Sequence, residues 1–260
     1  MRLLPRRLRP GEEATLVEHL GELRARIVIC LIATAVAFGV TYAFHHQLLD
    51  WLNAPLPEEN KKPATFGVAE PFITSVMISF WAAVALALPV ILWQVWAFFA
   101  PAFSERTQRH ILGFVLFATV LLVAGVAFGY FVALPTAVHF LTNYDKEQFN
   151  ILIRARDYYN FVLLVLMAVA VVFQLPIFVL ALARLGIVPA SKLRRNRRIG
   201  YVIVAALAVA LPGVDPVTTI MEMLPLMVLF ELSIWLAVFF DRRWTRQAEA
   251  RAAAFEAGDV

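Results

Sequence analysis

Six apolar runs constrain this chain more than any other feature of its sequence. Five of them are 18 to 28 residues long, and about 20 apolar residues in a helix cross the hydrocarbon core of a bilayer. Of all residues 61% are hydrophobic and 16% charged, against about 45–50% apolar and 25% charged in soluble domains. We therefore predict an all-α integral membrane protein with six transmembrane helices in one membrane domain, residues 1–260. The runs cover residues 27–44, 73–100, 111–134, 158–183, 199–211 and 217–240.

The fifth run is too short to cross an ordinary bilayer comfortably. Its 13 residues would rise about 20 Å as a helix, against a core of about 30 Å. It meets the sixth run at Leu211-Pro212-Gly213-Val214-Asp215-Pro216, where two prolines and a glycine end one helix and start the next. We predict short fifth and sixth spans joined by a tight hairpin, in a locally thin bilayer or shielded by neighbouring helices.

Lysine and arginine predict the orientation of these spans. The terminal segments and the second and fourth connections carry 18 of these residues, and the other connections carry 5. Cytoplasmic segments are the ones enriched in Lys and Arg, so we expect both termini, with tails 1–14 and 245–260, in the cytoplasm and the spans in the inner (plasma) membrane. Gly11, Glu12 and Glu13 follow the basic N-terminus in place of an apolar stretch, which argues against a cleaved signal peptide.

Several kinds of chemistry have no pattern in this sequence. It contains no phosphate-binding loop of the Gly-rich Lys-Ser/Thr type, no His-Glu-x-x-His pair and no Gly-x-Ser-x-Gly elbow. The pair His45-His46 has no third ligand at helical spacing, and the single cysteine, Cys30, builds neither a disulfide framework nor a thiolate metal site. The basic clusters lie beside apolar runs, where topology explains them better than nucleic acid. We expect no enzyme, no cofactor and no metal.

The connections and the prolines indicate an ordered, bent bundle. The loops 45–72 and 135–157 are the longest, and the first contains four prolines, which favour an ordered cap. Gly125 and Gly129 have the small-xxx-small spacing of close helix contacts. Leu-Pro pairs recur at irregular spacing, which predicts kinked helices without a sequence repeat. They are Leu88-Pro89, Leu134-Pro135, Leu175-Pro176, Leu211-Pro212 and Leu224-Pro225.

Polar side chains inside spans are costly and usually functional. The fourth span contains Gln174, and the sixth contains Glu222 and Glu231. The two glutamates are nine residues apart, on opposite helix faces, whereas Asp215 and Glu222 are seven apart and nearly share one. For Glu231 the alternative to function is a snorkelling or paired carboxylate near the inner surface. For Gln174 it is an interhelical hydrogen bond.

The segment before the first span presents carboxylates on a predicted cytoplasmic helix. Thr15 and Glu18 form a capping box that marks a helix start. Glu18, Glu22 and Arg26 then follow at i, i+4 spacing and make a charged stripe. Arg24 and Arg26 could neutralise these carboxylates internally. Alternatively an incoming arginine could bind them, because a guanidinium and a carboxylate match as a bidentate fork.

The stretch His19-Leu20-Gly21-Glu22-Leu23-Arg24-Ala25-Arg26 resembles the opening motif of the TatC family, the multi-spanning receptor of twin-arginine protein export. The resemblance extends over residues 15–244, and its most specific parts are this motif and the Gln-Val-Trp-Ala-Phe block. The other matching stretches follow in the same order. They are Ala54-Pro55-Leu56, Glu70-Pro71-Phe72, residues 89–101, Phe173-Gln174-Leu175-Pro176, residues 211–216 and Leu229-Phe230-Glu231.

The resemblance implies a glove-shaped bundle that binds Arg-Arg signal peptides of folded proteins. It also implies TatA- and TatB-type single-span partners on the fifth and sixth spans, an oligomeric complex in membrane lipid, transport driven by the proton-motive force, and no nucleic acid. The implied signal-peptide site comprises His19, Glu22, Arg24, Arg26, Phe98, Glu105 and Arg109. The implied outer-loop residues are Pro55, Pro71 and Phe72. The residues assigned to partner docking or to intramembrane polar contacts are Gln174, Pro212, Asp215, Glu222 and Glu231.

Two positions depart from the family pattern. The second acidic residue expected in the first cytoplasmic loop falls on Thr107, with Glu105 two residues before it. The fourth span carries Gln174 where the family often has Glu, which argues against a proton relay there. A secondary transporter for a small solute, using Gln174, Glu222 and Glu231, is the alternative of another class. The short hairpin by itself also predicts a site that a partner helix covers.

Overall fold

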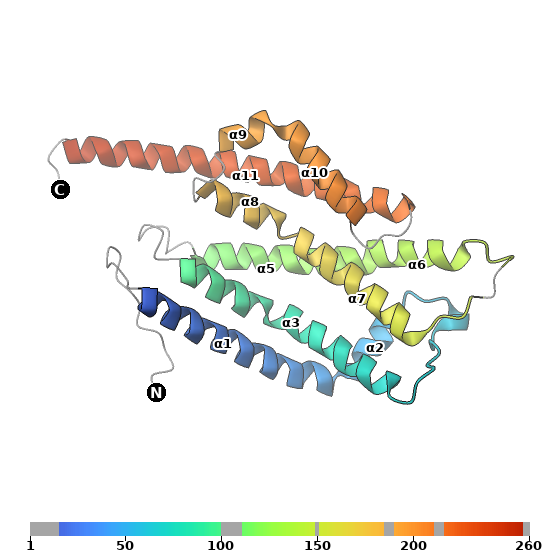
Figure 1. Cartoon of the computed structure of the whole chain (residues 1–260). Coiled ribbons are helices and arrows are strands. Elements are labelled where there is room, and N and C mark those ends of the chain that lie inside the picture. Colours follow the sequence, from blue (N-terminus) through green and yellow to red (C-terminus); the bar gives the residue numbers. More distant parts are fainter. Residues whose placement is uncertain (1–15, 100–110, 149–150, 185–189, 211–215, 257–260) are drawn as a thin grey trace. The chain divides into compact units, whose positions relative to one another are not determined.

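The structure is a computed structural model that describes residues 16–99, 111–148, 151–184, 190–210 and 216–256 (Figure 1). These residues form helices and one isolated β-bridge. In chain order the helical elements are α1 (Leu16–Ala43), α2 (His45–Asn53), the 3₁₀ turn η1 (Glu58–Asn60), α3 (Glu70–Phe99), α5 (Ile111–Phe128), the π-helical turn η3 (Gly129–Ala133), α6 (Leu134–Asn143), α7 (Ala155–Val172), α8 (Leu175–Arg184), α9 (Ala190–Arg195), α10 (Arg197–Ala210) and α11 (Pro216–Glu256).

Five helical stretches among the described residues are long and apolar enough to cross a membrane, which confirms the predicted class. They are His19–Ala43, Glu70–Phe98, Gly113–Asn143, Ala155–Ala183 and Pro216–Phe239. The predicted fifth span is α10, which has only 14 residues, as its short apolar run implied. The last span, Pro216–Phe239, agrees with the predicted run to within one residue, but its helix α11 is 41 residues long and continues past the apolar part. The alanines and arginines that follow residue 240 favour this continuation.

Two helices extend beyond their apolar runs. The first begins at Leu16, eleven residues before the apolar run at residue 27, and the proposed capping residue Thr15 lies outside the described residues. The helical stretch of the third span continues through α6 to Asn143, so residues 135–143, which were expected in a loop, are helical. Pro135 is the second residue of α6, which follows the π-helical turn directly, and the first turn of a helix tolerates proline. A span predicted from hydropathy alone ends at such a proline.

The Leu-Pro pairs have two structural outcomes. Pro135 and Pro176 are each the second residue of a new helix, after an interruption of the preceding one. Pro89 and Pro225 instead lie inside α3 and α11, which continue through them. Pro212 lies outside the described residues. A Leu-Pro pair therefore marks a break in some spans only, because the packing around each helix decides whether the lost hydrogen bond ends it.

The chain divides into two compact units, which we describe separately. Unit 1 comprises Met1–Val123 and Thr142–Leu164, and unit 2 comprises Ala124–Leu141 and Val165–Val260. In unit 1, α1 and α3 pack side by side (Figure 1) along a seam of Ala37, Ala83 and Ala87. Small residues let helix backbones approach closely in lipid. The hydroxyl of Thr41 donates to the carbonyl of Ser79 at 2.7 Å, which fixes the register of the two helices.

The two long loops of unit 1 are joined, which confirms the predicted ordered cap. We call residues 45–69 and 151–157 the loop cap. Ala64 and Arg154 form a β-bridge in which Ala64 N donates to Ile153 O at 2.9 Å. The hydroxyl of Tyr158 donates to the carbonyl of Leu52 at 2.5 Å and holds α2 against α7. Backbone and side-chain hydrogen bonds thus connect segments about one hundred residues apart in the chain.

In unit 2 close helix contacts occur where the sequence has glycine. A Cβ at Gly125 would lie 2.8 Å from Cβ of Phe173, and one at Gly129 would lie 3.1 Å from Cδ2 of Leu166. The predicted small-xxx-small contact of these glycines is therefore confirmed. Helices α8, α9 and α10 pack against α11, and a Cβ at Gly200 would overlap the ring of Phe230. The short α10 thus lies directly against the long last helix.

Candidate functional site

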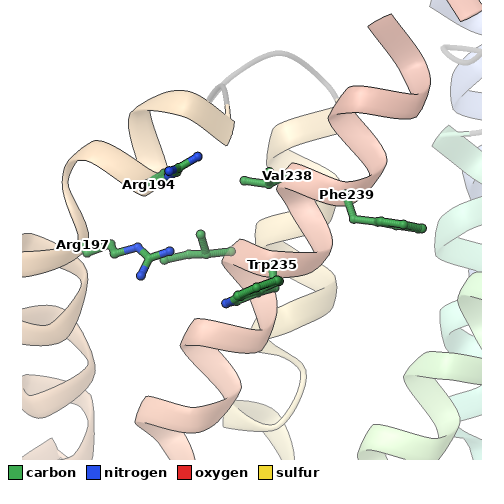
Figure 2. Close-up of a pocket in the computed structure, with 6 residues that line it drawn as sticks. Arg194, Arg197, Trp235, Val238 and Phe239 are labelled. Carbon is green, nitrogen blue, oxygen red and sulfur yellow. The ribbon is translucent and has the colours of Figure 1, made fainter. Parts of the chain in front are cut away.

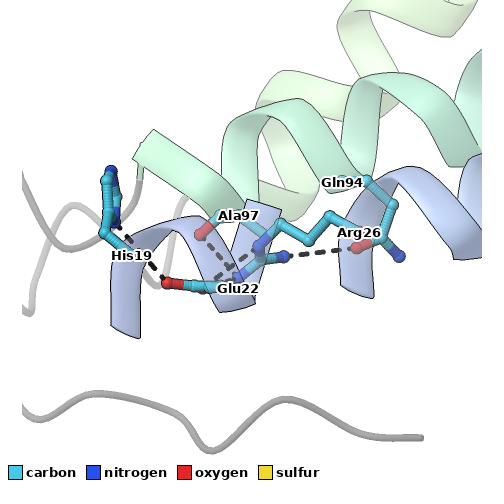
Figure 3. A network of polar contacts seen from close by, with 5 residues as sticks. All are labelled: His19, Glu22, Arg26, Gln94 and Ala97. Carbon is cyan, nitrogen blue, oxygen red and sulfur yellow. Dashed lines mark hydrogen bonds and ion pairs between the residues drawn. The ribbon is translucent and has the colours of Figure 1, made fainter. Parts of the chain in front are cut away.

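A cluster of polar groups joins the first turns of α1 to the last turns of α3 (Figure 3). Arg26 is its centre. Its Nε donates to Oε1 of Glu22 at 3.1 Å, and its Nη2 donates to the same oxygen. Nη1 donates to Oε1 of Gln94 at 3.2 Å, and Nη2 also reaches the carbonyl of Ala97 at 3.0 Å. The guanidinium therefore ties a carboxylate on one helix to two acceptors on the other.

Glu22 is buried, but only one of its two carboxylate oxygens accepts hydrogen bonds from the described residues. Its side chain is 8% exposed, and Oε1 accepts both hydrogen bonds from Arg26. Oε2 is buried and accepts no hydrogen bond from any residue that the structure describes. Nδ1 of His19 lies 4.0 Å from Oε2, at ion-pair distance but beyond hydrogen-bond range. A buried carboxylate oxygen without a donor is costly, so this oxygen is the obvious place for a further N–H group.

An aromatic pair borders the cluster. The rings of His19 and Phe98 stack with centroids 4.4 Å apart and planes 22° apart. His19 is 45% exposed, whereas the carboxylate that it borders is buried. The stack thus lies beside Glu22, and it brings together two residues that the resemblance had assigned to one site.

The expectation that Glu22 is displayed on a helix surface is wrong. The seam of small residues brings α1 and α3 together, and the Gln94 and Ala97 acceptors on α3 hold Arg26 over the carboxylate. Of the two internal partners considered, only Arg26 pairs with Glu22. Arg24 is exposed. The other two residues assigned to this site, Glu105 and Arg109, lie outside the described residues.

Sequence reasoning assigned no role to Gln94. It is a strongly polar side chain in the long apolar run of α3. This is the same signal that singled out Gln174 as a candidate functional residue. Its role depends on its partner Arg26, 68 positions earlier in the chain. Only the packing of the two helices reveals that pairing.

A second buried carboxylate, Glu70, holds the loop cap. Its Oε1 accepts from Arg154 Nε at 3.0 Å and from the backbone N–H of Arg156 at 3.3 Å. Its Oε2 accepts from the backbone N–H groups of Phe66 and Gly67 at 3.0 and 3.1 Å. Arg154 also lies over the ring of Phe66, and the Glu70 carboxylate raises the pKa of the Arg154 guanidinium.

Among the outer-loop residues implied by the resemblance, the neighbour Glu70 makes the polar contacts. Pro71 is the second residue of α3, a favourable place for proline, and is exposed. Phe72 is 64% exposed, and Pro55 is half-buried beside α2. The prolines shape the ends of helices here, whereas the carboxylate joins the loops. The signal for Glu70 was its position immediately before Pro71 at a helix start.

The predicted intramembrane polar residues of unit 2 have different surroundings. Gln174 is 6% exposed in the turn between α7 and α8, and Glu222 is 1% exposed within α11. Glu231 accepts a hydrogen bond from the hydroxyl of Tyr201 and lies 3.3 Å from Nη1 of Arg197. The paired-carboxylate alternative is therefore correct for Glu231. Pro212 and Asp215 lie outside the described residues.

Taken together, the described residues form an all-helical, multi-pass membrane protein with polar clusters at its helix ends. The family model described as Sec-independent protein translocase protein (TatC) matches residues 18–225. The TatC protein of Desulforapulum autotrophicum is 33% identical over 247 residues, which cover 94% of this chain and 92% of that protein. The TatC protein of Escherichia coli is 33% identical over 230 residues, covering 86% and 88%.

A solved structure agrees with these relatives. A crystal structure of the twin-arginine translocase receptor TatC in the detergent DDM matches with a TM-score of 0.73 and 28% sequence identity, covering 84% of this chain and 99% of that one. The chain therefore belongs to the TatC family. It is a multi-pass inner-membrane component of a protein translocase, and its family is not one of enzymes. This assignment favours the translocase over the small-solute transporter.

Proposed function

We propose that Glu22 and the residues around it form the site that binds Arg-Arg signal peptides of exported proteins, at the cytoplasmic face. The supporting observation is the half-used carboxylate: Arg26 occupies Oε1, and Oε2 is buried without a hydrogen bond from the described residues. An incoming guanidinium supplies the N–H donors that this oxygen lacks, as a charge-assisted hydrogen bond.

Selectivity for arginine over lysine follows from the same arrangement. A guanidinium is a planar fork that can donate to Oε2 with one nitrogen and stack its face on the neighbouring aromatic pair, whereas an ammonium is a point charge. The stacked rings of His19 and Phe98 lie at the border of the carboxylate. The internal Arg26 keeps the carboxylate oriented before a peptide arrives, which lowers the ordering cost of binding.

The test is the affinity of the purified full chain for an Arg-Arg signal peptide in lipid nanodiscs. We expect Glu22→Gln to weaken binding about tenfold to hundredfold, because one charge-assisted hydrogen bond is lost. Glu59→Gln makes the same chemical change at an exposed carboxylate and should bind like the wild type. Charge reversal at Glu22 with a compensating Glu in the peptide should restore part of the affinity.

Thermal unfolding of each variant separates a lost contact from a lost fold. If Glu22→Gln unfolds like the wild type and binds the Arg-Arg peptide with unchanged affinity, Glu22 does not belong to the site. If a Lys-Lys peptide binds the wild type as tightly as the Arg-Arg peptide, the fork geometry is not what is recognised.

We further propose that single-span partner subunits dock on α10 and the adjoining part of α11. The support is the mismatch of α10, whose 14 residues rise about 21 Å against a core of about 30 Å. The helix nevertheless exposes large apolar side chains, with Val202 69% and Val209 70% exposed. A partner helix on this face would cover the part of the short span that lipid solvates poorly.

Cysteine crosslinking tests this docking face in a Cys30→Ala background. Val202→Cys should crosslink to a cysteine in the membrane helix of a co-expressed single-span partner. Ala208→Cys is the matched control, because Ala208 is fully buried on the same helix. Equal crosslinking of the exposed and the buried position, or none at Val202 while the partner co-purifies, would place the partner elsewhere.

A further inference from the structure

A pocket of about 380 Å³ lies between α9, α10 and α11 in unit 2 (Figure 2). Its lining combines two arginines with four apolar side chains. The lining residues are Arg194, Arg197, Ile234, Trp235, Val238 and Phe239. Figure 2 shows Arg194 and Arg197 on the α9–α10 side and Val238 of α11 directed toward them, with Phe239 on the other side of α11. The pocket thus has one basic wall and one apolar wall.

The arginine at the base of this pocket is held in place but keeps bonding capacity. Nη1 of Arg197 lies 3.3 Å from Oε2 of Glu231, whose other oxygen accepts from the Tyr201 hydroxyl. Nε of Arg197 is buried and donates to none of the described residues. Arg194 adds a second positive charge and is exposed. One carboxylate against two guanidinium groups leaves the pocket with a net positive charge.

The apolar wall is open to the surroundings. Trp235 is 70% exposed and Phe239 is 51% exposed, whereas Ile234 is 1% exposed. These residues are in the last apolar turns of α11, where the span meets the end assigned to the cytoplasm by its Lys and Arg content. Tryptophan is typical of this depth, at the level of lipid headgroups. The pocket therefore opens to the bilayer at headgroup depth.

We infer that this pocket binds one anionic phospholipid of the cytoplasmic leaflet, with the phosphate on Arg194 and Arg197 and an acyl chain along Trp235 and Phe239. Basic pockets between transmembrane helices on the cytoplasmic side suit anionic headgroups. A free phosphate would use the arginines but leave the apolar wall uncovered. The Nε of Arg197 supplies a hydrogen bond that a zwitterionic lipid also accepts, but the second arginine favours a net negative charge.

Quenching of Trp235 fluorescence by brominated lipids tests this site. The full chain is placed in mixed micelles with brominated phosphatidylglycerol or brominated phosphatidylcholine, and the signal lost in Trp235→Phe isolates this residue. We expect the wild type to prefer phosphatidylglycerol, and Arg194→Gln to reduce that preference about fivefold. Arg194→Gln/Arg197→Gln should reduce it further. Arg195→Gln/Arg198→Gln, at two exposed arginines outside the pocket, should leave most of it.

Arg194→Gln leaves the pair of Arg197 with Glu231 intact, so a folding defect of the double variant cannot mimic its result. Equal quenching by the two lipids in the wild type would overturn the proposal. It would also fail if the control pair lowered the preference as much as the pocket pair, or if inorganic phosphate displaced the brominated lipid completely. Because the readout is lipid binding, it is independent of signal-peptide recognition at Glu22.

Discussion

Two buried carboxylates, Glu70 at the start of α3 and Glu22 on α1 beside the end of α3, differ in how many hydrogen bonds they accept. Glu70 accepts hydrogen bonds on both oxygens, from Arg154 and from three backbone N–H groups. Glu22 accepts on Oε1 alone, from Arg26, and its Oε2 is buried without a hydrogen bond from the described residues. Both side chains are about 8% exposed, so burial alone does not distinguish them.

The difference separates a structural carboxylate from one that is ready to bind. A fully satisfied buried charge stabilises the segments that donate to it, and any new ligand would have to displace an existing donor. A half-satisfied charge has already lost its water on one side, and its remaining oxygen gains most from a new donor. The loop cap and the proposed signal-peptide site are therefore built from the same pair of residue types with opposite consequences.

The largest effect that would sharpen this comparison is expected from Glu70→Gln. The amide cannot accept on both sides, so donors of the loop cap lose their partner. Trypsin cleavage after the exposed Lys61 should then accelerate about tenfold or more, because cleavage follows local opening. Peptide mass spectrometry of timed digests measures this rate.

Signal-peptide affinity serves as the cross-check on that variant. Glu70→Gln should bind the Arg-Arg peptide like the wild type, and Glu59→Gln, at an exposed carboxylate of the same loop, should digest like the wild type. A cap that stays resistant in Glu70→Gln would contradict the structural role of this carboxylate and remove the contrast with Glu22.

A smaller effect is expected from Gln94→Leu. Without this acceptor Arg26 is free to turn both of its N–H edges onto Glu22, so that it occupies Oε2 as a bidentate fork. The internal arginine then competes with the incoming one, and Arg-Arg peptide affinity should fall about fivefold. Titration of labelled peptide against the nanodisc-embedded chain gives this number.

Thr41→Val is the matched control for that variant, because it removes another polar contact between α1 and α3, at a distance from Glu22. It should cost about 0.6 kcal/mol of stability, as interhelical hydrogen bonds in membranes do on average, and leave peptide affinity unchanged. If Gln94→Leu bound the peptide as tightly as Thr41→Val, Arg26 would not be the competitor that we describe.

Local patterns predicted much of the fold. Apolar runs identified the spans, and the proline- and glycine-rich junction after residue 210 correctly predicted a short fifth helix. The spacing of Gly125 and Gly129 predicted a close helix contact that the structure contains. Each of these features depends on a few neighbouring residues, so a single stretch of sequence carries it. Boundaries were less predictable: α6 continues a span beyond Pro135, and α11 continues beyond its apolar part.

The sites were less accessible to this reasoning because their partners are distant in the chain. Motif resemblance singled out Glu22, but the exposed presentation expected for it is contradicted by its burial against α3. Gln94 and Arg154 were overlooked, since their roles depend on contacts with residues 68 and 84 positions away. For Glu231 a snorkelling or paired carboxylate was the alternative left open, and the structure supplied its partners Tyr201 and Arg197.

The sequence by itself determined that this chain spans a membrane, which stretches form its helices and to which family it belongs. Hydropathy and short motifs carry this information because they are properties of consecutive residues. The tertiary structure alone decided which carboxylate is saturated and which keeps an oxygen for a ligand. That distinction depends on which donors the packed helices bring within about 3 Å of each oxygen. The residues next to Glu22 and Glu70 in the sequence do not by themselves reveal it.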